Sequence, residues 1–282
     1  MAHTPRVAAI HDLSAFGRCS LTVVMPVLSA MGVQCCPIPT AYLSTHTGGF
    51  EGMVTLDLTE QMEGTIRHWG ELGLTFDGVY TGFLGSSRQI DLCIRAIREL
   101  KSGGGIAVVD PVMGDHGRRY RTYTEEMCAG MGELCRHADV ITPNLTEAAF
   151  LLGLDYDSLT GSGAEGMELA RMLSDNGRRS VVLTGVSDGE GRVGAACWDK
   201  TAGRGQLVMA PRVEGAYHGT GDLFSAVLTG SLVRGESLAC AAEKAAQFVS
   251  RCAARTKAQT YPRREGVDFE PLLGQLAGEK GL

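Results

Sequence analysis

The sequence predicts a single α/β domain in which a mostly parallel sheet is covered by helices on both faces. Short β-branched apolar runs alternate with segments of helical periodicity, which is the pattern of parallel strands joined by crossover helices. The 282 residues are 44% hydrophobic and include 38 glycines, a composition that excludes a disordered or fibrous chain and suits a fold with many turns. We therefore expect residues 1–282 to form one three-layer α-β-α sandwich.

The individual elements follow from these patterns in chain order. Parallel strands are expected at 7–10, 33–38, 78–80, 106–109, 140–141 and 181–183. Helices are expected between them at 21–31, 60–72, 88–101, 125–135, 146–152 and 164–176, where apolar residues recur at intervals of three and four. The runs 193–198 and 205–209 flank a polar turn at 199–204 and predict an antiparallel hairpin at one edge of the sheet. Three last helices are expected at 223–233, 238–255 and near 269–276.

Charge and cysteine content narrow the class of protein. The net charge of -6 does not favour a nucleic-acid partner, which calls for a basic surface. The nine cysteines have no Cys-x-x-Cys spacing, so we expect reduced thiols and no structural zinc site. No uninterrupted apolar run reaches the roughly 18 residues of a membrane span, and residues 1–5 carry no export leader. We expect a cytoplasmic enzyme that does not bind a membrane.

The most informative segment is Gly219-Thr220-Gly221-Asp222, which opens an apolar helical run. Two glycines let the backbone approach an anion closely, and the free N–H groups of a helix N-terminus point toward that anion with the helix dipole behind them. Asp222 could accept a proton from an attacking hydroxyl group. The ordinary alternative is that Asp222 only caps the helix after a flexible turn.

Three polar segments follow strands, at 110–115, 142–147 and 184–185. Ligands of open parallel sheets bind beyond the carboxyl ends of the strands, so these segments are candidates for a shared site. The carboxylates of Asp110 and Glu147 suit a hydrated magnesium ion. The ordinary alternative is a capping box, with Thr142 or Asn144 as the N-cap of a helix and Glu147 as its partner.

Taken together, these segments resemble the motifs of the ribokinase-like (PfkB) superfamily of small-molecule kinases, and within it the pyridoxal and hydroxymethylpyrimidine kinase branch. Residues 110–114 resemble its Asp-Pro-Val-Met-Gly segment, Asn144 with Glu147 its Asn-x-x-Glu motif, and 219–222 its Gly-x-Gly-Asp loop. Residues 44–47 and 82–86 are similar to the Ser-Asn-His-Thr and Gly-Tyr-Leu-Gly-Ser stretches of pyridoxal kinases. The resemblance covers nearly the whole chain.

The resemblance implies ATP- and Mg²⁺-dependent phosphorylation of the 5′-hydroxymethyl group of a vitamin B6 vitamer, a pyridine-type alcohol. Asp222 is then the general base, and the N–H groups of Gly219, Thr220 and Gly221 stabilise the migrating phosphoryl group. Asp110 and Glu147 hold Mg²⁺ through water. The implied ATP-binding residues are Asp110, Thr142, Asn144, Glu147, Thr184, Gly185, Pro211, Arg212, Thr220 and Gly221; the implied substrate-binding residues are Asp12, Thr45, His46, Phe83 and Asp222. A homodimer is also implied, and a requirement for a monovalent cation is left open.

Each acceptor-side residue also has an ordinary explanation. Phe83 could be a core residue, His46 a polar residue with internal partners, and Asp12 the cap of the helix that begins near Ser20. Many pyridoxal kinases carry serine where Asp12 stands, and some carry lysine where Thr184 stands. Both contacts are therefore expected to differ here.

Other functions are weighed against this one. A nicotinamide-dependent dehydrogenase is disfavoured because no Gly-x-Gly-x-x-Gly follows the first strand, and no Gly-x-x-x-x-Gly-Lys loop occurs. Hydroxymethylpyrimidine kinase, a sugar or nucleoside kinase, and a non-catalytic nucleotide-binding relative stay open. The segment 115–121 carries Arg118, Arg119 and Arg121, and it is either a lid that closes over the substrates or a solvated charged loop.

Overall fold

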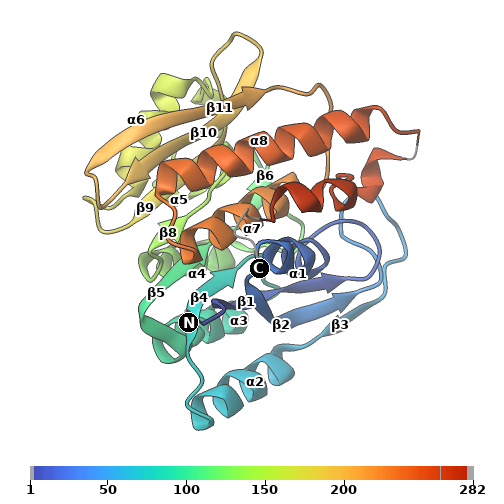
Figure 1. The fold of residues 1–282 in the computed structure, drawn as a ribbon, viewed down its shortest axis with the longest axis vertical. Coiled ribbons are helices and arrows are strands. Elements are labelled where there is room, and N and C mark those ends of the chain that lie inside the picture. Colours follow the sequence, from blue (N-terminus) through green and yellow to red (C-terminus); the bar gives the residue numbers. More distant parts are fainter. Residues whose placement is uncertain (1–2, 261, 278–282) are drawn as a thin grey trace.

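The computed structural model describes residues 3–260 and 262–277, and its centre is a nine-stranded sheet (Figure 1). The strands lie in the order β11-β10-β9-β8-β5-β4-β1-β2-β3. Neighbours from β9 through β2 are parallel, whereas β2–β3, β9–β10 and β10–β11 are antiparallel. The predicted mostly parallel sheet with an antiparallel edge hairpin is confirmed. The strands are β1 (Arg6–Ser14), β2 (Gln34–Leu43), β3 (Thr55–Asp57), β4 (Phe76–Thr81), β5 (Lys101–Val109), β8 (Val140–Ile141), β9 (Ser180–Ser187), β10 (Arg192–Asp199) and β11 (Arg204–Pro211).

Helices cover both faces of this sheet, and a separate hydrophobic core lies under each layer. Helices α1, α7 and α8 pack on one face and α2 to α6 on the other (Figure 1). They are α1 (Leu21–Ala30), α2 (Thr59–Glu71), α3 (Ser87–Leu100), α4 (Glu125–Arg136), α5 (Leu145–Leu152), α6 (Gly163–Leu173), α7 (Thr220–Val233) and α8 (Leu238–Lys257). Within the described ranges, no helix has the length and apolarity that crossing a membrane requires.

Strand β1 shows why the sheet is buried on both sides. Val7 and Ala9 belong to the core under α1, α7 and α8, whereas Ala8 and Ile10 belong to the core under α2 to α6. Successive side chains of a strand point to opposite faces, so a strand with helices on both sides is apolar at every position. This continuous apolar pattern is what the sequence analysis used to locate the parallel strands.

The segment that follows α8 differs from its prediction. Residues 270–275 form a 3₁₀ helix, η3 (Glu270–Gln275), with Pro271 in its first turn, after the shorter η2 (Arg263–Glu265). The helix predicted near 269–276 is therefore present, but as a 3₁₀ helix. A 3₁₀ helix needs only i→i+3 hydrogen bonds, and apolar spacing over six residues does not distinguish it from an α-helix.

The sequence patterns do not predict three short strands. β3 adds an antiparallel edge beyond β2, and β6 (Gly114–Asp115) pairs with β7 (Arg118–Arg119) in a separate ribbon. This ribbon lies in the segment expected to be an irregular loop at 115–121. His116 and Gly117, with φ of 49° and 74°, form its two-residue turn, the geometry that a type I′ hairpin requires.

Candidate active site

The glycine-rich segment lies at the N-terminus of α7, which begins at Thr220, three residues earlier than expected. Gly219 is the N-cap with φ 79°, and a Cβ there would lie 1.9 Å from the carbonyl oxygen of Arg18. Only glycine fits this position. A Cβ at Gly221 would meet nothing within 4 Å. The N–H groups of residues 220–222 have no acceptor within the helix because they belong to its first turn. Asp222 is therefore a first-turn residue, and its interpretation as the N-cap was wrong.

The carboxyl group of Asp222 lies among other acidic groups. Burial raises its pKa to about 7, and the negative charges of Asp110 and Asp12 contribute in the same direction. A hydrogen bond from the backbone N–H of Ser20 opposes this rise. A carboxylate with a pKa near neutrality is suited to accept a proton at physiological pH.

A hydroxyl group on α7 ties the helix to two of the strand-end segments. The Oγ of Ser225, one turn beyond Asp222, lies 3.0 Å from Oδ2 of Asp110 and 3.1 Å from Oγ1 of Thr142. All three of these bonded side chains are buried, and burial raises the pKa of Asp110 to about 7. The turns after β5 and β8 and the N-terminal part of α7 therefore meet at one place.

Asn144 and Glu147 form the predicted capping box at the start of α5. Asn144 Oδ1 accepts from the Glu147 N–H at 2.9 Å, and Glu147 Oε2 accepts from the Asn144 N–H at 2.9 Å. The same two side chains reach the segment after Asp110. Glu147 Oε1 accepts from the Met113 N–H at 3.0 Å, and Asn144 Nδ2 donates to the Gly114 carbonyl at 2.9 Å. The capping box thus also fixes the beginning of the β6–β7 ribbon.

Asp110 and Glu147 fit a hydrated divalent cation. Burial raises the pKa of Glu147 well above its ordinary value, and the charge of Asp110 raises it further. Two buried carboxylates that repel each other are stabilised by a nearby cation, and oxygen donors are the ligands that magnesium prefers. Both carboxylate oxygens of Glu147 already accept backbone hydrogen bonds, so this residue is suited to hold a cation through water.

Asp12, at the end of β1, is buried and fully engaged with hydroxyl groups. Its Oδ2 accepts from Ser14 Oγ at 2.7 Å and its Oδ1 from Ser20 Oγ at 2.5 Å. The N-cap of α1 is Ser20, so the interpretation of Asp12 as that cap was wrong. Burial raises the pKa of Asp12. On the neighbouring segment, the Oγ1 of Thr45 is buried and has no hydrogen-bond partner, which leaves it available to a ligand.

His46 and Phe83 have internal contacts that support their ordinary explanations. The Nε2 of His46 lies 2.6 Å from the carbonyl oxygen of Arg264, and its Nδ1 accepts from the Gly48 N–H at 3.0 Å. Both ring nitrogens are therefore in use. Phe83 packs against the core and meets the ring of Tyr123 edge-on at 6.1 Å. Their roles in acceptor binding stay predictions.

The residues expected along the nucleotide lie on the antiparallel side of the sheet. Strand β9 continues through Thr184 and Gly185, so the expectation that they form a loop after the strand was wrong. Gly185 has φ 83° and is skipped by the register of β9 with β10, which defines a β-bulge. The Thr184 N–H donates to the Pro143 carbonyl at 2.9 Å, beside the turn after β8. Pro211 ends β11, and Arg212 follows it as an exposed residue.

Some residues at this site are missing from the sequence prediction. His11 is fully buried, both of its ring nitrogens lack partners, and its ring meets Tyr80 edge-on at 4.3 Å. Burial lowers the pKa of His11 to about 3, so its ring is neutral. The signal for His11 was its place immediately before Asp12. The signal for Ser225 was a hydroxyl group inside the apolar run of α7.

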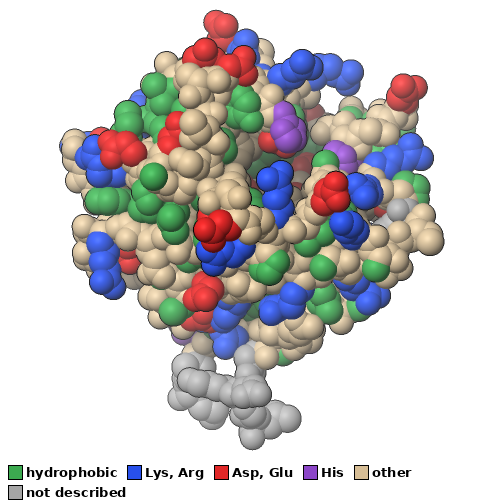
Figure 2. Space-filling view, turned by 90° about the horizontal axis from the view of Figure 1, so that it is seen from above, with side chains coloured by type: hydrophobic (Ala, Val, Ile, Leu, Met, Phe, Trp, Pro, Cys, Tyr) green, Lys and Arg blue, Asp and Glu red, His purple; other side chains and the backbone are tan. Residues whose placement is uncertain are grey.

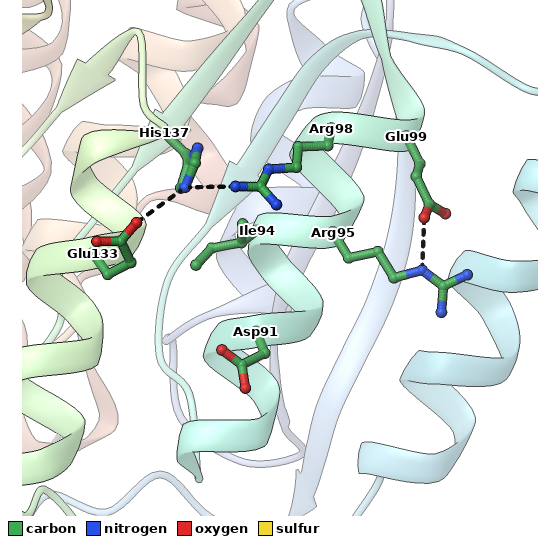
Figure 3. A pocket seen from close by; sticks show the side chains of 7 residues that line it. All are labelled: Asp91, Ile94, Arg95, Arg98, Glu99, Glu133 and His137. Carbon is green, nitrogen blue, oxygen red and sulfur yellow. Dashed lines mark hydrogen bonds and ion pairs between the residues drawn. The ribbon is translucent and has the colours of Figure 1, made fainter.

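The surface is hollowed in the view of Figure 2, where histidine side chains lie at the rim and Lys and Arg side chains lie around it. A separate hollow of about 330 Å³ lies between α3 and α4 (Figure 3). None of the predicted site residues lines this second hollow, whose residues are Asp91, Ile94, Arg95, Arg98, Glu99, Glu133 and His137. Its charges are largely paired with each other, as in the 2.8 Å Arg95–Glu99 ion pair.

The fold and the site together define a small-molecule kinase of the ribokinase-like class. The chain belongs to the phosphomethylpyrimidine kinase family, whose model matches residues 25–264. A pyridoxine/pyridoxal/pyridoxamine kinase of Bordetella bronchiseptica is 30% identical over 266 residues, which cover 89% of each chain. A Bacteroides thetaiotaomicron structure of a candidate phosphomethylpyrimidine kinase, solved with pyridoxal, is 41% identical with a TM-score of 0.91 and covers 97% of this chain and 96% of that one. The pyridoxal kinase of Lactobacillus plantarum is 33% identical with a TM-score of 0.89, covering 97% of each chain. The predicted family is thus confirmed.

We predict that alanine has different effects at the two glycines of residues 219–222, which we call the anion loop. Gly219→Ala places a methyl group against a backbone oxygen at positive φ, so it should lower the free energy of unfolding by about 1–3 kcal/mol or more. Gly221→Ala places its methyl group in open space, so it should melt like the wild type and lose about 10²-fold or more in kcat by obstructing the anion. Thermal melts and steady-state kinetics check both. A fully active Gly221→Ala variant would contradict the anion site.

Proposed function

We propose that the chain catalyses ATP-dependent phosphorylation of the 5′-hydroxymethyl group of pyridoxal, pyridoxine or pyridoxamine. The observation that carries the proposal is Asp222, a carboxylate with a pKa near 7 beside the free N–H groups that begin α7. Relatives named as kinases of these vitamers support the substrate class, as does the 41% identical structure solved with pyridoxal. None of the relatives and structures named above is a sugar or nucleoside kinase.

The proposed reaction is in-line transfer of the terminal phosphoryl group of ATP to the acceptor alcohol. Asp222 accepts the proton of the hydroxymethyl group as its oxygen attacks. The N–H groups of Thr220 and Gly221, with that of Gly219, stabilise the charge on the phosphoryl oxygens. Because such a reaction needs little covalent participation of the protein, catalysis rests on positioning and on charge stabilisation.

Magnesium belongs to the proposal as the cofactor of the reaction. When bound, Mg²⁺ would supply positive charge that neutralises the nucleotide phosphates. Asp110 and Glu147 would hold it, and Thr142 fixes Asp110 through their shared partner Ser225. Asn144 orients the phosphates from the start of α5.

The nucleotide extends from the phosphates along the bulge of β9. Thr184 and Gly185 lie along it, because the bulge is next to the turn after β8, where the Thr184 N–H contacts the Pro143 carbonyl. Pro211 and Arg212 lie toward the adenine. Arg212 lines a surface hollow of about 460 Å³ with residues of the C-terminal end of α8.

The acceptor lies between β1 and the segment after β2. Thr45 contributes its unpartnered hydroxyl group, and Asp12 contributes a carboxylate that suits a protonated ring nitrogen or amine. Phe83 provides an aromatic face. In the proposal His46 acts by holding its own segment to the carbonyl group of Arg264, in addition to lining the acceptor.

Hydroxymethylpyrimidine kinase is the second candidate function. It is favoured by the family model, which is described as phosphomethylpyrimidine kinase, and by the name of the 41% identical structure. Both candidate acceptors carry a hydroxymethyl group on a nitrogen heterocycle, so the same base and anion loop serve either. Steady-state assays with ATP and each acceptor separate the two functions by kcat/KM.

The proposal further describes residues 1–282 as one kinase domain that acts in the cytoplasm as a homodimer. One sheet includes strands from Arg6 to Pro211, which supports a single domain. The edge strand β3 leaves Leu56 and the adjacent Val54 about 58% and 64% exposed, and an apolar strand edge of this kind suits pairing with a second copy. A mass measured by light scattering distinguishes the dimer from the monomer.

We predict that Asp222→Asn abolishes turnover without unfolding the protein. The amide cannot accept the proton, so kcat should fall by about 10²–10⁴-fold. Binding of ATP measured by calorimetry and the melting temperature should stay close to the wild type. Near-wild-type kcat on every acceptor would show that Asp222 is not the base.

The pH dependence of kcat is expected to follow the ionisation of Asp222. Only the deprotonated carboxylate accepts a proton, and burial raises its pKa to about 7. Activity should therefore rise with pH up to about 7 and fall roughly tenfold per unit below it. The residual activity of Asp222→Asn serves as the control and should lack this acidic limb. A profile that is flat across this range contradicts the assignment.

We predict that the β6–β7 ribbon acts as a lid over the substrates. Arg118, Arg119 and Arg121 are exposed on or next to it, and guanidinium groups pair well with phosphates. Replacing all three by alanine should increase ATP hydrolysis without acceptor or raise the KM for ATP. The matched control is alanine at Arg67, which lies on α2. Unchanged kinetics of the triple variant would leave the ribbon as a solvated surface element.

A further inference from the structure

Ser20 has a backbone conformation that is unusual for a residue with a side chain. Its φ is 54° and its ψ is -132°, a combination that glycine adopts and other residues avoid. The residue is also buried, with 5% of its surface exposed. Strained conformations of this kind persist only where surrounding contacts hold them, and they gather at functional sites.

The side chain of Ser20 does not cap α1, although Ser20 is the N-cap residue of that helix. Ser20 is the N-cap of α1, where a serine hydroxyl ordinarily accepts from a backbone N–H of the first helical turn. No such bond forms here. Instead, the Oγ of Ser20 donates to Oδ1 of Asp12 at 2.5 Å. Helix capping is therefore given up in favour of a bond to a buried carboxylate.

The backbone of the same residue lies beside α7. Its N–H is near enough to the carboxylate of Asp222 to lower the pKa of that group, against the larger effect of burial. The preceding segment packs directly against the anion loop, because a Cβ on Gly219 would lie 1.9 Å from the carbonyl oxygen of Arg18 and 3.7 Å from the Sγ of Cys19. Ser20 thus joins a carboxylate at the end of β1 to another carboxylate on α7.

We propose that Ser20 is a positioning residue for Asp222. The bond from its Oγ to Asp12 holds the backbone in the strained conformation, and in that conformation its N–H fixes the base beside the acceptor hydroxyl group. The inference rests on the proposed function of Asp222. A misplacement of a reacting group by about 1 Å can reduce a rate by about 10²-fold, so small movements of the base matter.

Two substitutions separate the anchoring bond from the strain. Ser20→Ala removes the hydroxyl group but keeps the unfavourable φ, so the released backbone should relax and withdraw its N–H. Ser20→Gly also removes the hydroxyl group, but glycine adopts positive φ without a steric penalty, so the N–H can stay in place. The geometry therefore predicts a higher kcat for Ser20→Gly than for Ser20→Ala.

The test measures kcat, the KM for ATP and the melting temperature of both variants. Ser20→Ala should lose about tenfold or more in kcat with little change in the KM for ATP, and Ser20→Gly should stay within about threefold of the wild type. Asn176 provides the matched control, because its φ is 56° in an exposed turn after α6. Alanine and glycine at Asn176 should differ in melting temperature and leave kcat unchanged.

Each outcome supports or overturns the inference. Equal kcat for the wild type and both Ser20 variants overturns it, and so does an equal loss in both, which would mean that the hydroxyl group itself serves the acceptor. If Ser20→Ala does not fold, a loss of more than about tenfold in Ser20→Gly overturns the inference on its own. An active Asp222→Asn variant would instead overturn the proposed function, so the two failures are distinguishable.

Discussion

The burial of several carboxylates in one poorly solvated place is the constraint on which the rest of this structure depends, and repulsion between them adds to it. Asp12, Asp110 and Asp222 come from the end of β1, the end of β5 and the first turn of α7, and the charges of Asp12 and Asp110 act on Asp222. Glu147 joins them from α5 through its interaction with Asp110. Like charges in such surroundings raise each other's pKa and destabilise the folded state when ionised. Hydrogen bonds from neighbouring hydroxyl and backbone N–H groups offset part of this cost.

The sign of this effect follows from linkage. In the folded protein the pKa of Asp110 and of Asp222 is about 7, above the ordinary value of 3.8. Between these values the folded state binds more protons than the unfolded state, so the free energy of unfolding falls as pH rises through the window from 3.8 to about 7. The folded protein with both carboxylates ionised is therefore less stable than the folded protein with both protonated. A cation bound near Asp110 and Glu147 would lower this cost.

Much of the fold could be predicted from the sequence because its signals are local. The continuous apolar pattern of β1 requires helices on both faces, and Asn144 with Glu147 both caps α5 and marks the site. The missing features depend on contacts between distant residues. The bulge at Gly185 is defined by pairing with β10, and His46 is occupied by the carbonyl group of Arg264, 218 residues away. The sequence around Gly185 and His46 contains no periodicity or motif that predicts these partners.

The same distinction explains why the C-terminal segment matters to a site that motifs assign to earlier parts of the chain. The Arg18 N–H donates to the Glu265 carbonyl at 3.1 Å, and the Val267 N–H donates to the His218 carbonyl at 3.2 Å. With the bond from His46, these contacts tie residues 264–267 to the segment before α1 and to the residue that precedes Gly219. Residues of any type can make backbone hydrogen bonds, so the sequence of this segment does not predict these contacts. Residues 264–267 thus hold the segment before α1 and the segment before α7 together, because the two segments can separate only if these bonds break.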